Sequence, residues 1–210
     1  LAMQYMFKAL ADDERGLFIS FDETRRNFFR RAAGLRMDFE PHGDRFTFLQ
    51  IDPAELSPGE LASVIRSHVE ERQAAVVVLD SLSGYQNAMP EEQFLLLQMH
   101  ELLTYLNQQG VLTFLVLAQH GLVGHMQSPV DLTYLSDAVL LLRFFEAFGE
   151  LRRAISVVKK RTGGHESSIR EYRIDKSGLR VGEPLRDFSG IFTGVPTYVG
   201  GEGDLLQNRE

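Results

Sequence analysis

Ala74-Ala-Val-Val-Val-Leu-Asp80 is a continuous apolar run that ends on an acidic residue. Runs of this kind are typical of parallel strands that are buried on both faces of a sheet. A second short apolar run, Gly16-Leu-Phe-Ile-Ser-Phe21, is followed directly by the acidic pair Asp22-Glu23. The two runs predict buried strands that carry acidic residues at their carboxyl ends.

Helical patterns alternate with these strands along the first part of the chain. Ser57 reads as a helix cap, Pro58 takes the first helical position, and Glu60 completes a capping box. The predicted helices cover residues 1–10, 24–34, 58–72 and 91–109, and further strands cover residues 45–51 and 111–118. Later strands joined by glycine turns predict antiparallel hairpins over residues 139–145, 151–159 and 168–174. The order predicts an α/β fold with a mostly parallel, doubly wound sheet that is extended by carboxyl-terminal antiparallel hairpins.

The composition excludes several classes of protein. The 210 residues are 44% hydrophobic, enough for one domain with a sizeable core, and 22 basic against 29 acidic residues give a net charge of −7. This acidic balance argues against nucleic acid or anionic lipid as the main partner. The absence of cysteine excludes disulfides and thiolate metal sites. The longest strongly apolar stretch, residues 138–145, is too short to span a bilayer, so we expect a cytoplasmic protein with no membrane segment.

The first ten residues form a helical pattern that has no cap. Apolar residues from Leu1 to Leu10 fit a mostly buried helix, yet nothing ahead of them can accept its first backbone N–H groups. The chain also begins with leucine rather than methionine. We therefore expect that a preceding piece of the protein lies outside these 210 residues.

Acidic residues are expected at the carboxyl edge of the sheet, where open α/β sheets bind ligands. Asp80 has the form of a Walker B acid, whose carboxylate organises the Mg²⁺ of a bound nucleotide through water. Glu23 could polarise a water for attack on the γ-phosphate. The alternative is structural: Asp80 would then only end a capped turn, and Asp22 and Glu23 would be solvated loop charges.

A nucleotide site of this type also needs a glycine-rich phosphate loop that ends in Gly-Lys. No Gly-Lys pair occurs in this chain. In P-loop folds the motif lies just before the first helix, which is where this sequence begins. A chain without the loop is expected to bind ATP poorly and to be inactive by itself.

A basic strand end offers a second candidate for phosphate binding. Lys159 and Arg161 face the same way on a strand with a two-residue period, next to a glycine-containing loop that holds His165. Two cations on one face could reach a phosphate in this subunit or in a neighbour. The alternative is a solvated strand end and an ordinary loop histidine.

Taken in order, these pieces resemble the KaiC branch of the RecA-like P-loop ATPases. The resemblance runs from Leu1 to about Tyr198 and is most specific in the carboxyl half. The motifs there are Leu135-Ser-Asp-Ala-Val-Leu-Leu-Leu, Gly149-Glu-Leu-Arg-Arg-Ala-Ile, Val158-Lys-Lys-Arg-Thr-Gly-Gly-His165, Ile169-Arg-Glu-Tyr, Lys176-Ser-Gly-Leu-Arg-Val and Phe192-Thr-Gly-Val-Pro196. The opening Leu1-Ala-Met-Gln resembles the helix that follows a Walker A motif. The resemblance therefore places the phosphate loop just upstream of residue 1, the ATPase domain over residues 1–196 and a flexible tail over residues 197–210.

The resemblance also implies an activity. It is the Mg²⁺-dependent hydrolysis of ATP at the subunit interfaces of a ring, usually a hexamer. Asp22 and Glu23 match the family's tandem catalytic acids, although glutamate is usual at both positions. Asp80 matches the Walker B acid that supports Mg²⁺, with Ser81 beside it in the nucleotide site.

Further residues match those that the family uses between protomers. Lys159, Arg161 and His165 match residues that contact the nucleotide of the adjacent subunit, as arginine fingers do. Clock members of the family also phosphorylate an adjacent serine and threonine ahead of the Ser-Asp segment. Here those positions are Thr133 and Tyr134, so Thr133 is the candidate phosphosite and the tyrosine departs from the pattern. ATP hydrolysis is the first expectation, ahead of autokinase activity and a clock-like role with a signalling or clock protein as partner.

Two other functions fit part of the sequence. A RecA- or RadA-like DNA recombination or repair ATPase would bind DNA through the loop of residues 119–129, but that loop holds no lysine or arginine. A catalytically silent module for oligomerisation or signalling would keep the fold without the hydrolysis. The absence of a phosphate loop within the chain is the observation that favours the silent module.

Overall fold

The two apolar runs are neighbouring parallel strands in the computed structural model. β1 (Gly16–Ser20) pairs with β3 (Val76–Asp80), in a register that sets Ser20 opposite Asp80. The backbone N–H of Phe21 also donates to the carbonyl of Asp80 at 2.9 Å, so the pairing continues past the end of β1. The segments that follow the two strands therefore begin side by side.

The chain divides into two units, and the structure describes residues 1–87, 92–118, 134–193 and 196–200. The first unit is formed mainly by residues 1–118, and the second mainly by residues 136–174 and 179–200. The parallel strands belong to the first unit and the long antiparallel strands to the second. Within these described ranges, no helix is both long enough and apolar enough to cross a membrane.

The first unit is built on a parallel sheet with the strand order β2-β1-β3-β4. Its other elements are α1 (Ala2–Ala11), α2 (Arg25–Gly34), η1 (Glu40–Arg45), β2 (Phe46–Gln50), α3 (Pro58–Arg72), α4 (Leu82–Asn87), α5 (Glu92–Gln108) and β4 (Leu112–Leu115). Strands and helices alternate along the chain as the sequence predicts. The predicted α/β class, with a parallel sheet and added antiparallel strands, is confirmed.

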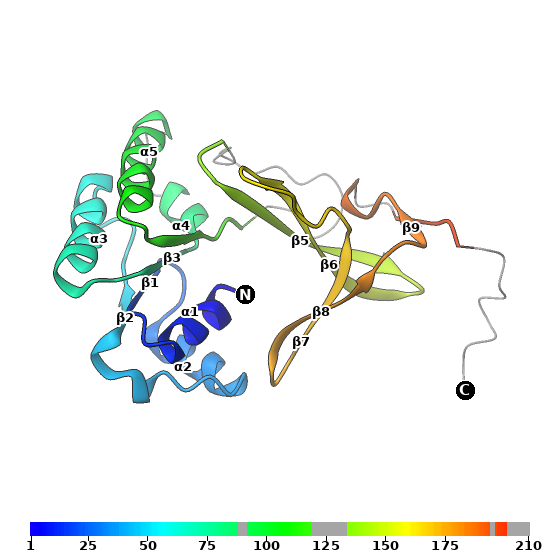
Figure 1. The fold of residues 1–210 in the computed structure, drawn as a ribbon, viewed down its shortest axis with the longest axis horizontal. Helices are drawn as coiled ribbons and strands as arrows, with labels where there is room; N and C mark the ends of the chain where they lie inside the picture. Colours follow the sequence, from blue (N-terminus) through cyan, green and yellow to red (C-terminus); the bar gives the residue numbers. More distant parts are fainter. Residues whose placement is uncertain (88–91, 119–133, 194–195, 201–210) are drawn as a thin grey trace. The chain divides into compact units, whose positions relative to one another are not determined.

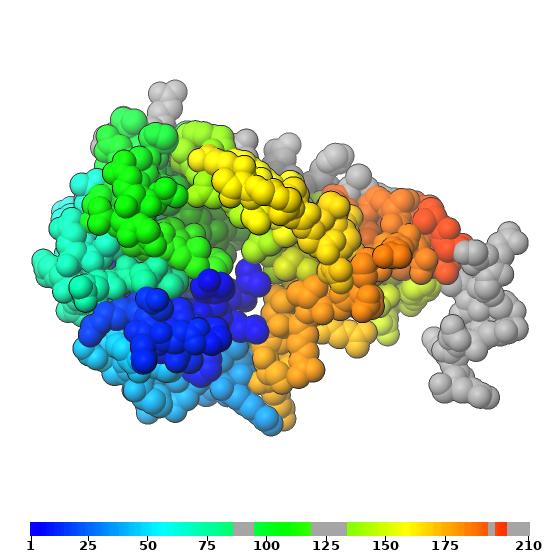
Figure 2. All heavy atoms as spheres, in the orientation of Figure 1, coloured from blue at the N-terminus to red at the C-terminus, as the bar shows by residue number. Residues whose placement is uncertain are grey.

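Helices cover both faces of this sheet because alternate strand residues point to opposite sides. Ile19 and Leu79 lie in the core beneath α3 and α5, whereas Phe18 and Val78 lie in the core beneath α1 and α2. Figure 1 shows the two helical layers on either side of the strands. Figure 2 shows them as space-filling atoms, blue for α1 and α2 and cyan to green for α3 and α5. The sheet is therefore doubly wound.

Two helices of the first unit, α2 and α3, begin where their capping residues predict. The backbone N–H of Glu60 donates to the Ser57 hydroxyl at 3.3 Å, and the Glu60 carboxylate accepts from the Ser57 N–H at 2.8 Å. This reciprocal pair is the predicted capping box of α3. At α2, the Thr24 hydroxyl accepts from the backbone N–H of Asn27 at 3.3 Å. The start of α1 has no side-chain cap.

The second unit is built on an antiparallel sheet with the strand order β5-β6-β7-β8. Its elements are β5 (Ala138–Ala147), β6 (Glu150–Lys160), β7 (Arg170–Asp175), β8 (Gly178–Pro184), β9 (Phe188–Ser189), η2 (Ile191–Thr193) and β10 (Thr197–Tyr198). Phe148 and Gly149 have φ values of 55° and 73° and form the two-residue turn of the long β5–β6 hairpin in Figure 1. The predicted hairpins are present, and the strands beyond Asp175 add to them.

Three elements of the first unit differ from the prediction, and one of them is η1, where no element was predicted. The predicted strand over residues 111–118 is paired as a strand only over Leu112–Leu115. Beyond it the Val116 N–H still donates to the Leu79 carbonyl of β3 at 3.0 Å. The Val116 carbonyl accepts from the N–H of Leu82 in α4, and the Ala118 N–H donates to the Ser83 hydroxyl at 3.0 Å. The short helix α4 was not predicted, because its Ser83-Gly84 sequence has low helical propensity.

Candidate functional site

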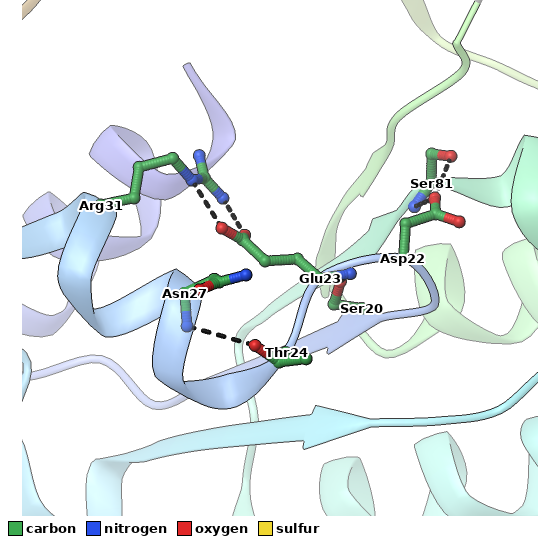
Figure 3. A network of polar contacts seen from close by, with 7 residues as sticks. All are labelled: Ser20, Asp22, Glu23, Thr24, Asn27, Arg31 and Ser81. Carbon is green, nitrogen blue, oxygen red and sulfur yellow. Dashed lines mark hydrogen bonds and ion pairs between the residues drawn. The ribbon is translucent and has the colours of Figure 1, made fainter.

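The carboxyl edge of the parallel sheet brings the predicted acidic residues together. Asp22 and Glu23 follow β1, Asp80 is the last residue of β3, and Ser81 comes next. In Figure 3 the side chains of Asp22 and Glu23 leave the same loop in different directions, the first toward Ser81 and the second toward α2. The two adjacent carboxylates therefore have different surroundings.

The Asp22 carboxylate connects the loop after β1 to the loop after β3. Its Oδ2 accepts from the Ser81 hydroxyl at 2.8 Å and from the Ser81 backbone N–H at 3.4 Å. Ser81 is buried, and the peptide bond that joins it to Asp80 is cis. Gly84 lies against the same carboxylate, since a Cβ at that position would come within 2.5 Å of Asp22 Oδ1. Asp22 is thus held between a buried hydroxyl and the backbone of α4.

The Glu23 carboxylate is bound by an arginine on α2. Arg31 Nε donates to Glu23 Oε1 at 3.1 Å, and Arg31 Nη2 donates to Oε2, so the pair is bidentate. The backbone N–H of Glu23 donates to the hydroxyl of Ser20, a buried residue, at 2.9 Å. Both the main chain and the side chain of Glu23 are therefore fixed, as the dashed contacts in Figure 3 show for the side chain.

Asp80 is a half-buried acid that is close enough to Asp22, Glu23 and Arg31 to be affected by their charges. Burial raises the pKa of the Asp80 carboxyl above its ordinary value. The Arg31 guanidinium lowers this pKa, whereas the carboxylates of Glu23 and Asp22 raise it. The charged form of Asp80 is consequently disfavoured, and an added cation near it would stabilise that form.

The oxygen donors at this edge fit a magnesium ion that arrives with a nucleotide. Mg²⁺ prefers oxygen ligands, keeps several waters, and is usually bound through one or two carboxylates together with substrate phosphates. Across the part of the chain that the structure describes, no group of three or more His, Asp or Glu side chains could hold a metal ion. Asp80, with its disfavoured charge, is the residue of this edge best suited to support such an ion, directly or through water.

The predicted basic residues lie in the second unit, at the end of β6. Arg161 directly follows the strand, and its Nη1 lies 3.2 Å from Asp137 Oδ1, with both side chains more than half exposed. Lys159 lies opposite Val139, just after the point where the β5–β6 register shifts by one residue. His165 is exposed. An exposed ion pair of this kind contributes only about 0–1 kcal/mol to stability.

Three residues of the site were not predicted from the sequence: Ser20, Arg31 and Gly84. Arg31 lies seven residues after the helix cap Thr24, which is two helical turns and hence the same face. That spacing is the signal by which it could have been found. Thr133 and the loop of residues 119–129 lie outside the described residues.

Comparison with known proteins gives consistent matches. The sequence model of the family described as "ATPase: KaiC" matches residues 1–186. The chain is 28% identical over 201 residues to "Circadian clock protein KaiC3" of Synechocystis sp., an alignment that covers 94% of this chain and 40% of that protein. It is 26% identical to "Circadian clock oscillator protein KaiC" of Thermostichus vulcanus over 201 residues and to that of Synechococcus elongatus over 202, covering 95% of this chain and 39% of each protein. The chain spans about two fifths of the length of these curated relatives.

Proposed function

Because this chain belongs to the KaiC family of ATPase domains, we propose that it hydrolyses ATP within a ring-shaped homo-oligomer of the full-length protein. The observation that carries the proposal is the meeting of Asp22, Glu23 and Asp80 at the carboxyl edge of a doubly wound sheet. Ligands of open α/β folds bind at this edge.

Each acid has a separate role in the proposed reaction. Glu23 orients the attacking water and accepts its proton while the water oxygen bonds to the γ-phosphorus and the bond from that phosphorus to ADP breaks. Asp80 supports Mg²⁺, which when bound offsets the charge of the phosphates. Asp22 is proposed as the second catalytic acid beside Glu23, and its carboxylate also holds the loop after β3 by accepting from the Ser81 hydroxyl.

The basic residues after β6 are proposed to act on the nucleotide of the neighbouring subunit. Lys159 and Arg161 would stabilise the charge that develops on the phosphates, with His165 in the same contact loop. An arginine supplied in this way is worth roughly 10³–10⁵ in rate. The arrangement requires a closed ring, for which we propose a hexamer.

A signalling role is proposed from the relatives, whose names are those of circadian clock proteins. In that role a partner protein would recognise the nucleotide state of the ring. Thr133 is proposed as an autophosphorylation site from the sequence alone. Incubation of the full-length protein with ATP, followed by mass spectrometry of the peptide that contains Thr133, tests the autokinase activity.

The central test uses the full-length natural protein. Glu23→Gln and Arg161→Ala are each expected to reduce ATP turnover by at least tenfold, whereas their matched controls Glu71→Gln and Arg186→Ala keep it. Glu71 and Arg186 are exposed residues remote in sequence from the proposed groups. Unchanged turnover in both Glu23→Gln and Arg161→Ala would show that the site assignment is wrong.

Residues 1–210 expressed alone provide a second measurement. They contain no Gly-Lys pair, so we propose that they bind ATP more weakly than the full-length protein and do not turn it over. Titration with a fluorescent ATP analogue compares the two. If the full-length protein also lacks turnover above background, the silent oligomerisation module becomes the better explanation.

A further inference from the structure

We propose that Arg31 is a positioning residue for ATP hydrolysis, which holds the Glu23 carboxylate in the orientation needed to receive the proton of the attacking water. The proposal rests on the function assigned to Glu23 above. It concerns a contact within one subunit, between Arg31 in the last turn of α2 and the loop after β1.

The contact has the geometry that fixes a carboxylate most firmly. Arg31 donates from Nε and Nη2 to the two different oxygens of Glu23, and the Glu23 side chain is only 22% exposed. A planar guanidinium bound in this way sets the plane of the carboxylate as well as its distance. Each carboxylate oxygen still has a lone pair that can accept from water. This bidentate contact, the fork, therefore restrains the Glu23 carboxylate and still leaves its oxygens able to accept a hydrogen bond from water.

The arginine is itself supported by the core. Its guanidinium carbon lies 5.8 Å from the centre of the Phe28 ring, and Phe28 is fully buried. Phe28 packs with its ring centre 4.8 Å from that of Phe18 on β1 and 4.6 Å from that of Phe48 on β2. The orientation of Glu23 is thus tied through Arg31 to the sheet that also carries Asp80. Reactive groups are positioned well when their supports are rigid in this way.

The charge and the geometry of the Arg31 side chain can be separated by substitution. A lysine at position 31 would keep this charge but could not form the fork. Arg30, the preceding residue on the helix, is exposed and offers a variant with the same loss of charge at a different place.

The loss of the fork has a specific kinetic consequence. Without Arg31 the Glu23 carboxylate rotates among several side-chain rotamers, and only some of them face the water. The turnover number therefore falls by more than the affinity for ATP, because no direct contact to the nucleotide is removed. Misplacement of a reacting group by about 1 Å costs on the order of 10²-fold in rate.

The experiment measures kcat and KM for ATP, and thermal unfolding without nucleotide, on variants of the full-length protein. The variants are Arg31→Gln, Arg31→Lys, Glu23→Gln, the double variant Arg31→Gln/Glu23→Gln and the control Arg30→Gln. We expect roughly 10- to 100-fold lower kcat with a smaller change in KM in Arg31→Gln, partial recovery of kcat in Arg31→Lys, and no change in Arg30→Gln. The double variant should be no slower than Glu23→Gln. Without nucleotide, the double variant should lower the melting temperature by less than the sum of the decreases in Arg31→Gln and Glu23→Gln. The reason is that both single substitutions break the same ion pair.

Several outcomes would overturn the proposal. Wild-type or raised kcat in Arg31→Gln would show that the ion pair is neutral or inhibitory. A fully additive loss of rate in the double variant would show that Arg31 acts independently of Glu23. If Arg31→Gln does not fold, equal kcat in Arg31→Lys and the wild type decides against the fork. Wild-type turnover in Glu23→Gln would instead refute the proposed function of Glu23.

Discussion

Single residues decide what each acid at the carboxyl edge can do. Asp22 and Glu23 are adjacent in the sequence and chemically similar, yet one is bound by Ser81 and the other by Arg31. The topology of the sheet is enough to place both residues beside Asp80. Their partners come from loops and helices 59 and eight residues away, so the pattern of the chain alone could not separate their roles.

Gly84 gives a prediction at this scale. Gly84→Ala would place a Cβ 2.5 Å from Asp22 Oδ1, and the carboxylate would have to turn away from the Ser81 hydroxyl. We expect a loss of roughly 1–3 kcal/mol in the free energy of unfolding, because Ser81 is buried and loses its partner. Urea denaturation measures this change in the free energy of unfolding. The control Gly59→Ala meets no atom within 4 Å and should be neutral or stabilising.

At the scale of helices and strands, local signals account for most of what could be predicted. Ser57 and Glu60 specify the start of α3 through bonds between near neighbours in the chain. The apolar run that becomes β3 can also be predicted from the local sequence, because any strand buried on both faces needs such a run. By contrast, α4 depends on the bond between Ser83 and Ala118, which joins residues that are far apart in the sequence. Such elements are set by tertiary contacts.

The start of α3 predicts a pH effect on stability. The backbone N–H and then the hydroxyl of Ser57 lower the pKa of the Glu60 carboxyl. A depressed carboxyl pKa stabilises the fold above the pKa of the unfolded chain, and this stability is lost as pH falls through the folded pKa. Ser57→Ala should lower the free energy of unfolding by about 1 kcal/mol at neutral pH. Below about pH 4.5, the variant should lose less stability than the wild type as the pH falls.

Denaturation of Ser57→Ala at pH 7 and at a series of values below pH 4.5 checks this prediction. The control is Ser63→Ala, an exposed position within the same helix. It should show the wild-type dependence on pH and a small gain in stability, because alanine has the higher helix propensity. The same pH dependence in Ser57→Ala and the wild type would refute the role of the capping box.

The β5–β6 turn gives a prediction for the second unit. Gly149 has φ of 73°, a left-handed conformation that is unfavourable for alanine. Gly149→Ala should therefore lower the free energy of unfolding by roughly 1–2 kcal/mol. Gly164→Ala, at a glycine with no atom within 4 Å of the added Cβ, should leave it unchanged. Equal stability of the two variants would indicate that the turn adopts another conformation in solution.

At the scale of the whole molecule, the proposed reaction divides the chain between two subunits. Glu23 and Asp80 belong to the first unit, and Lys159 and Arg161 to the second. In the proposed ring, the first unit of one protomer would meet the second unit of its neighbour. A net charge of −7 fits such a nucleotide-driven assembly better than a protein that coats DNA.

Mixing of inactive variants tests this division directly. Full-length Glu23→Gln keeps Arg161, and full-length Arg161→Ala keeps Glu23, so a mixed ring contains some interfaces with both natural residues. Random assembly at equal concentrations should give about one quarter of the sites their full set, and ATP turnover should recover to about that fraction. Each variant alone should stay inactive. A double variant carrying both substitutions, mixed in place of either partner, should abolish the recovery. If mixing restores no turnover although native mass spectrometry detects mixed rings, Arg161 does not act on the neighbouring subunit.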